Sequence, residues 1–112
     1  MSRLPTHVEV GSILRRAAAA GDFATVIRKG DAERGALLLL ITGRGRHVAT
    51  LERVPSLDGD YCWQSGDPSE SASSMEIADF LASRTRFDDD LWAIELDIAE
   101  PERFIAETTS AG

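Results

Sequence analysis

The sequence predicts an α+β fold: one antiparallel sheet of about five strands, two main helices on one face, and a short C-terminal helix. Two segments place apolar residues at the three-and-four spacing of an amphipathic helix. Other segments alternate apolar and polar residues or run continuously apolar, as strands do. The connections between strands are short, which favours an antiparallel meander. At 112 residues the chain is expected to be a single domain, 1–112, with 6–106 as its ordered core.

The first helix is expected over residues 6–20. Thr6 is a candidate N-cap, with Glu9 at the capping-box spacing three residues later. Gly21 suits the left-handed position that follows a helix. The apolar stripe of this helix consists of Val10, Ile13, Leu14, Ala17 and Ala18.

Four strands are expected next, connected by short glycine-rich or aspartate-rich turns. The continuous leucine run in the second of them predicts a central strand that is buried on both faces. The residues from Gly43 to Arg46 form the tight turn that follows it. The four predicted strands span residues 23–28, 36–42, 47–54 and 61–64.

The remaining chain predicts a helix, a strand and a short helix. Ser73 and Glu76 again have capping-box spacing, and the amphipathic pattern that follows runs to about Arg86. Residues 91–98 alternate cleanly, with Trp92, Ile94, Leu96 and Ile98 on one predicted core face. Pro101 suits the first position of a terminal helix with Phe104 and Ile105 inward.

The two halves of the chain carry opposite charge. Residues 1–56 hold nine Arg and Lys against five Asp and Glu, whereas residues 57–112 hold three against fourteen. The net charge of −7 disfavours nucleic acids and anionic membranes as general partners. A basic patch on one copy could meet an acidic patch on another, so the asymmetry favours a salt-sensitive homodimer or another protein partner.

The sequence indicates a cytoplasmic protein. Cys62 is the single cysteine, which excludes an internal disulfide framework. The N-terminal residues show no signal-peptide pattern. The longest apolar run, 36–41, is far too short to span a membrane.

Several short pieces of the sequence resemble a known family. They are Ile13-Leu14-Arg15-Arg16, Phe23-Ala24-Thr25-Val26, Gly30-Asp31 and Phe87-Asp88-x-Asp90-Leu91-Trp92. Because of these pieces, the chain resembles the small alphaproteobacterial proteins of domain-of-unknown-function family 1491. The resemblance extends over about residues 6–106. Asp89 stands where proline is common in that family. The resemblance implies a compact α+β fold in a bacterial cytoplasm, and it carries no activity, cofactor or catalytic residue.

Basic residues of the N-terminal half are the candidate contacts for an anion or a partner. Aromatic residues do not interleave with them, so a base-stacking platform is missing and a nucleic acid is disfavoured. The alternative interpretation is a solvated edge that prevents sheets from pairing. The candidate residues are Arg15, Arg16, Arg28, Arg44 and Arg46.

A second candidate group is a polar cluster near the predicted last strand: Arg86, Asp88, Asp90 and Glu95. Consecutive aspartates could offer oxygen ligands to Mg²⁺ or Ca²⁺, but their spacing does not match an EF-hand. The favoured interpretation is structural, with aspartates capping a turn and arginines pairing with them. Glu95 would need an arginine partner, Arg28 or Arg53, if its face of the sheet is covered.

No catalytic residue, metal site or cofactor is predicted. The Gly30–Gly35 loop lacks a P-loop ending and leads into a strand, which indicates a plain turn. Cys62 is expected to be buried and structural. The sequence leaves the function unknown, favours a non-enzymatic protein-interaction module, and is compatible with a homodimer. The alternative is a binding protein for an anionic small molecule or nucleic acid through the basic N-terminal half.

Overall fold

The computed structural model describes residues 4–109, which form three helices and one five-stranded sheet. None of these helices has the length and apolar character needed to cross a bilayer. In chain order the elements are α1 (Thr6–Ala19), β1 (Phe23–Arg28), β2 (Leu37–Gly43), β3 (Arg46–Pro55), β4 (Tyr61–Gly66), α2 (Ser74–Phe87), β5 (Trp92–Asp97) and α3 (Pro101–Thr109).

The sheet is mixed, with the strand order β1-β5-β2-β3-β4. β5 lies between β1 and β2, antiparallel to the first and parallel to the second. The prediction of a purely antiparallel sheet is therefore wrong. The physical reason is α2, which separates β4 from β5 and gives the chain enough length to cross over and enter the sheet parallel to β2.

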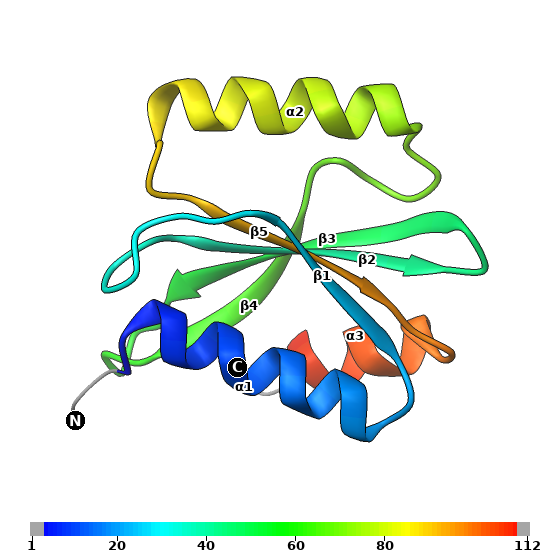
Figure 1. Cartoon of the computed structure of the whole chain (residues 1–112), viewed down its shortest axis with the longest axis horizontal. Coiled ribbons are helices and arrows are strands. Elements are labelled where there is room, and N and C mark those ends of the chain that lie inside the picture. The colour runs from blue at the N-terminus through cyan, green and yellow to red at the C-terminus, as the bar shows by residue number, and fades with distance from the viewer. Residues whose placement is uncertain (1–3, 110–112) are drawn as a thin grey trace.

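The helices lie on both faces of the sheet. Figure 1 shows α1 and α3 on one face and α2 on the other, so the molecule has three layers. The expectation that both main helices share one face is not met. The apolar residues of β2 explain the arrangement, because they are buried on both sides of the strand and both faces need a cover.

The main core lies between the sheet and the α1 and α3 layer. Leu37, Leu39 and Ile41 of β2 point into it, together with apolar residues of β5 and α1. Phe104 and Ile105 of α3 pack against this core, as predicted. The core face of β5 is also as predicted, since Trp92, Ile94, Leu96 and Ile98 all belong to this cluster.

α2 covers the other face without burying a residue of its own. Its sheet-facing side chains, among them Ile77, Phe80 and Leu81, are only half-buried. Arg84 joins the helix to β3 through two hydrogen bonds to the carboxylate of Glu52, at 3.1 and 2.9 Å. These bonds raise the pKa of the Arg84 guanidinium above its usual value, so the pair stays charged.

The start of α1 is capped by a distant loop. The main-chain amides of Thr6 and His7 donate to the carbonyls of Glu33 and Ala32, at 3.2 and 2.8 Å. Thr6 is the first helical residue and not the N-cap, and its buried hydroxyl donates to the Gly35 carbonyl at 3.0 Å. The predicted Thr6–Glu9 capping box is therefore wrong, because the loop satisfies these amides.

Two other helix-end predictions are confirmed. Gly21 has a φ of +81°, the left-handed conformation expected after α1. Ser73 and Glu76 form the reciprocal capping box at the start of α2, with bonds of 3.0 and 3.1 Å. Both signals depend on residues within four positions of one another, which is why the sequence displays them.

A buried polar group anchors the loop that leads to α2. Thr50 donates to the carbonyl of Pro68 at 2.8 Å, and His47 Nε2 lies 3.0 Å from the Thr50 hydroxyl. His47 and Thr50 are almost fully buried. These bonds hold the loop against β3 and so fix where α2 begins.

Candidate functional site

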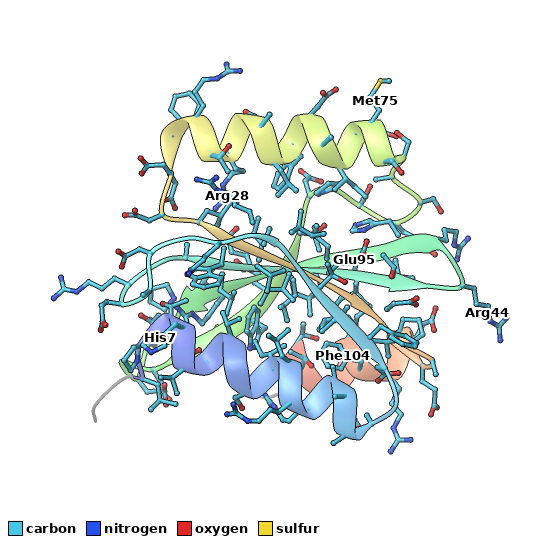
Figure 2. All side chains as sticks on the ribbon, in the orientation of Figure 1. His7, Arg28, Arg44, Met75, Glu95 and Phe104 are labelled. Atoms are coloured by element: carbon cyan, nitrogen blue, oxygen red, sulfur yellow. The ribbon has the colours of Figure 1, made fainter. Side chains whose placement is uncertain are left out.

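The predicted basic residues do not form one patch. Arg15 and Arg16 are exposed on α1, and Arg28 ends β1. Arg44 and Arg46 occupy the β2–β3 hairpin, and Figure 2 shows Arg44 at the far right of the molecule, well away from Arg28 beneath α2. Arg46 already pairs with Glu70 at 3.2 Å, so the five arginines do not act as one surface.

The predicted polar cluster forms a turn. Asp88 accepts the main-chain amide of Asp90 at 3.1 Å and ends α2. Arg86 is exposed and makes no ion pair with the described residues. Partial desolvation raises the pKa of Asp90, and the nearby carboxylates of Asp89 and Asp31 add to this shift. Residues 4–109 contain no cluster of three or more His, Cys, Asp or Glu side chains that could hold a metal ion.

The loop before β2 docks on the turn before β5. The amide of Asp31 donates to the carbonyl of Asp90 at 3.0 Å, and the indole of Trp92 donates to the carbonyl of Asp31 at 2.7 Å. A side chain at Gly30 or Gly35 would collide with the Asp90 carbonyl. Two pieces that carry the family resemblance therefore meet here: Gly30-Asp31 and the segment that contains Asp90 and Trp92. Their contact joins the two halves of the chain.

Glu95 lies on the sheet face that α2 covers and is half-buried (Figure 2). Neither of its predicted partners binds it. Arg53 lies on the opposite face and pairs with Glu9, whereas Arg28 donates to the carbonyl of Asp89 at 2.7 Å.

The predicted burial of Cys62 is incomplete, because this side chain is half-buried in the edge strand β4.

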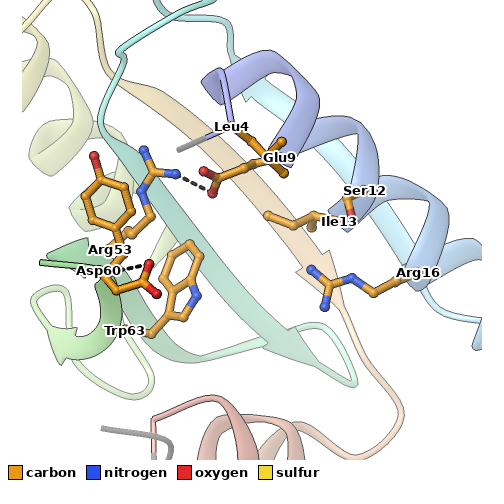
Figure 3. A pocket seen from close by; sticks show the side chains of 9 residues that line it. Leu4, Glu9, Ser12, Ile13, Arg16, Arg53, Asp60 and Trp63 are labelled. Atoms are coloured by element: carbon orange, nitrogen blue, oxygen red, sulfur yellow. Dashed lines mark hydrogen bonds and ion pairs between the residues drawn. The ribbon is translucent and has the colours of Figure 1, made fainter. Parts of the chain in front are cut away.

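One concave surface is a groove between α1 and the β3–β4 side of the sheet. Figure 3 shows Glu9, Ile13 and Arg16 of α1 on one wall and Arg53 and Trp63 on the other. The hollow has a volume of about 440 Å³. It is built where α1 leaves the outer strands β3 and β4 uncovered.

One end of this groove carries a buried charge network. The Arg53 guanidinium forms an ion pair with Glu9 and a hydrogen bond to the Gly35 carbonyl at 3.3 Å. It also lies 4.3 Å from the ring centre of Tyr61, within cation–π range. The side chain of Arg53 is only 7% exposed, so its charge is neutralised inside the protein.

The other end of the groove is apolar. A second hollow of about 200 Å³ adjoins the first and shares Ile13, Arg16 and Trp63 with it. Leu96 and Phe104 are among the residues that line it, where α3 approaches the sheet. We call the two hollows together the α1–α3 groove.

Sequence reasoning missed this groove, although it singled out Arg16. Trp63 and Phe104 lie on elements far apart in the sequence, and only the strand order brings them to one side of α1. A weak signal was present in the small side chains of Ala17 and Ala20, which leave space where larger residues would fill it.

The fold defines the class of protein: a small three-layered α+β domain built on a mixed five-stranded sheet. The family described as "Protein of unknown function (DUF1491)" matches residues 4–106. The chain belongs to this family, as the resemblance in its sequence indicated.

Three solved structures with the same fold come from two bacteria. An NMR structure of a DUF1491 family protein from Caulobacter crescentus is 29% identical, covers 90% of this chain and 91% of that one, and has a TM-score of 0.76. A crystal structure of a DUF1491 family protein from the same organism is 31% identical over 86% and 89%, with a TM-score of 0.72. The solution structure of a protein from A. tumefaciens is 29% identical over 88% and 89%, with a TM-score of 0.74. No curated protein matches the chain.

Proposed function

We propose that this chain is a non-enzymatic, cytoplasmic protein-interaction module that forms a homodimer through the free edge of β1. The observation that carries the proposal is the composition of this edge. β1 pairs with β5 on one side only, and its other side is the end of the sheet. Its first five residues, Phe-Ala-Thr-Val-Ile, contain neither a charge nor a proline.

Such an edge is unusual in a protein that remains monomeric. Phe23, Val26 and Ile27 are 73%, 38% and 47% exposed, although all three are large and apolar. Monomeric proteins protect free edges with charges, prolines or covering segments, because unpaired amides and carbonyls recruit other strands. The opposite edge is less apolar, because β4 ends in the exposed polar sequence Gln64-Ser65-Gly66.

A second copy of the chain fits this edge. Asp22 precedes β1, whereas Arg28 ends it and Lys29 follows it. Antiparallel pairing of two copies brings the acidic start of each strand to the basic end of the other, so the charges at both ends attract. A two-fold axis at Thr25 would also set Phe23 near the partner subunit's Ile27, both apolar.

The test is to place a charge on the edge. Thr25→Lys should weaken dimerisation at least about tenfold, because two lysines would meet at the two-fold axis. The matched control is Gln64→Lys, which adds the same charge at the exposed edge of β4. Sedimentation equilibrium over a range of protein concentrations measures the effect. A monomeric wild-type protein, or equal loss in both variants, would contradict the proposal.

The salt dependence separates this interface from one held by long-range charge. Edge pairing relies on main-chain hydrogen bonds and apolar contact, so the dimer should persist near 1 M salt, where the Debye length is about 3 Å. A dimer that dissociates on raising the salt would instead favour pairing of the basic and acidic halves.

A further inference from the structure

The α1–α3 groove has an apolar inner end that the described residues leave unfilled. Its walls come from Leu39 and Leu96 of the sheet, Ile98 after β5, and Phe104 of α3. Protein interiors pack to the density of organic crystals and leave few voids larger than a water molecule. A hollow of about 200 Å³ with such a lining has room for an apolar group.

The charge at the junction of the two hollows is positive and unpaired. Arg16 lines both hollows and is exposed, and its guanidinium makes no hydrogen bond or ion pair with the described residues. The other arginine of the groove, Arg53, is neutralised by Glu9.

Two further acids line the groove, and both already accept main-chain amides. Asp60 accepts the amide of Tyr61 at 3.0 Å, and Asp22 accepts the amide of Ala99 at 3.1 Å. Neither carboxylate pairs with Arg16. The guanidinium is therefore free to hold an anion beside the apolar hollow.

We propose that the α1–α3 groove binds a small amphipathic carboxylate with the shape of a medium-chain fatty acid. Its alkyl chain occupies the hollow among Leu96, Ile98 and Phe104, and its carboxylate pairs with Arg16. The inner hollow is smaller than the roughly 300–1,000 Å³ of sites for drug-sized ligands, which suits a short chain. The site lies on the α1 and α3 face and does not depend on pairing through β1.

Octanoate is the probe, and Trp63 is the reporter. Trp63 lines both hollows and is half-buried, whereas the second tryptophan, Trp92, is buried in the core. Octanoate should change the tryptophan fluorescence saturably with one site per chain, and Trp63→Phe should abolish the signal. Calorimetry provides an independent measure of the same binding. Acetate lacks the chain and 1-octanol lacks the charge, so each should bind at least about tenfold more weakly.

Arg16→Ala should weaken octanoate binding at least about tenfold, because the carboxylate loses its charged hydrogen bonds. Arg15→Ala is the matched control: it removes the same charge from the preceding position of α1, outside the groove lining. It should leave the affinity for octanoate within about twofold of wild type, since exposed charges contribute little at a distance.

Ala17→Leu is the second test, because a leucine there fills the inner hollow and suits a helix. It should abolish octanoate binding without lowering the melting temperature. Absence of saturable binding to the wild type, equal loss in Arg15→Ala and Arg16→Ala, or unchanged binding in a folded Ala17→Leu variant would each overturn the proposal.

Discussion

Gly30 and Gly35 show how single residues decide whether the two halves of this chain can meet. A Cβ atom at either position would collide with the Asp90 carbonyl. That carbonyl cannot simply move away, because it accepts the amide of Asp31 at 3.0 Å. Here glycine is required by the close approach of two backbone segments, and Gly30 does not have a positive φ.

Gly30→Ala is expected to lower the free energy of unfolding by about 3 kcal/mol, the cost of forcing extra atoms into a filled site. The control is Gly66→Ala, because a Cβ at that exposed position meets no atom within 4 Å. Urea denaturation of both variants measures the difference. Equal stability of the two variants would mean that the loop and the Asp90 turn separate without cost.

For single residues, the sequence predicts the local structure, such as a turn, but not the distant contact that requires a particular residue there. The glycines around residues 30–35 are correctly interpreted as belonging to a turn, since turn chemistry is local. Their contact with Asp90 depends on the fold as a whole. Thr6 is similar: its hydroxyl looks like an N-cap in the sequence, but the structure uses it to hold the Gly35 carbonyl.

At the scale of elements, α2 combines a well-marked start with loose packing. Its capping box is complete, yet none of its residues is buried. The Arg84–Glu52 pair and half-buried apolar side chains attach it to the sheet. Such an element opens at a lower free energy than the core strands do. The sequence shows its apolar stripe, but a stripe does not say which face of a sheet it covers.

The capping box makes the start of α2 sensitive to acid. Hydrogen bonds from the amide and hydroxyl of Ser73 lower the pKa of Glu76. The ionised carboxylate therefore stabilises the folded protein above its unfolded pKa, and this contribution is lost as the pH falls through the lowered, folded pKa.

Glu76→Gln should accordingly lower the melting temperature at neutral pH and have little effect at a pH below the folded pKa. Melting curves followed by circular dichroism across this range provide the measurement. Asp79→Asn is the control, since Asp79 is exposed on the same helix and its carboxylate makes no hydrogen bond with the described residues. A temperature difference that is constant with pH would show that the carboxylate charge does not matter.

The whole molecule is organised by β5, whose place the sequence does not reveal. Its alternating pattern is compatible with a strand at either the edge or the centre of a sheet. Ala93 is fully buried and Glu95 half-buried, so the second face is closed as well. Each strand and its approximate bounds follow from local patterns, whereas strand order and the α1–α3 groove depend on contacts across the whole chain.

Ile94 tests the central place of β5. It is fully buried and lies opposite Val26 of β1 and Leu39 of β2. Ile94→Ala should cost about 2–5 kcal/mol, a large share of the stability of a small domain. Leu57→Ala, in an exposed loop, should be nearly neutral. Denaturant midpoints of both variants check this, and a small loss for Ile94→Ala would place the core elsewhere.

The position of β5 also bears on how the protein is made. β1 pairs with no strand except β5, which follows 69 residues later if counted from Phe23 to Trp92. At about 5–20 residues per second, a translating ribosome needs roughly 3–14 s to add that length. During this time the uncharged Phe-Ala-Thr-Val-Ile segment has neither of its edges paired. The nascent chain therefore cannot complete its sheet strand by strand, and a chaperone that shields residues 23–27 would act while β5 is still being synthesised.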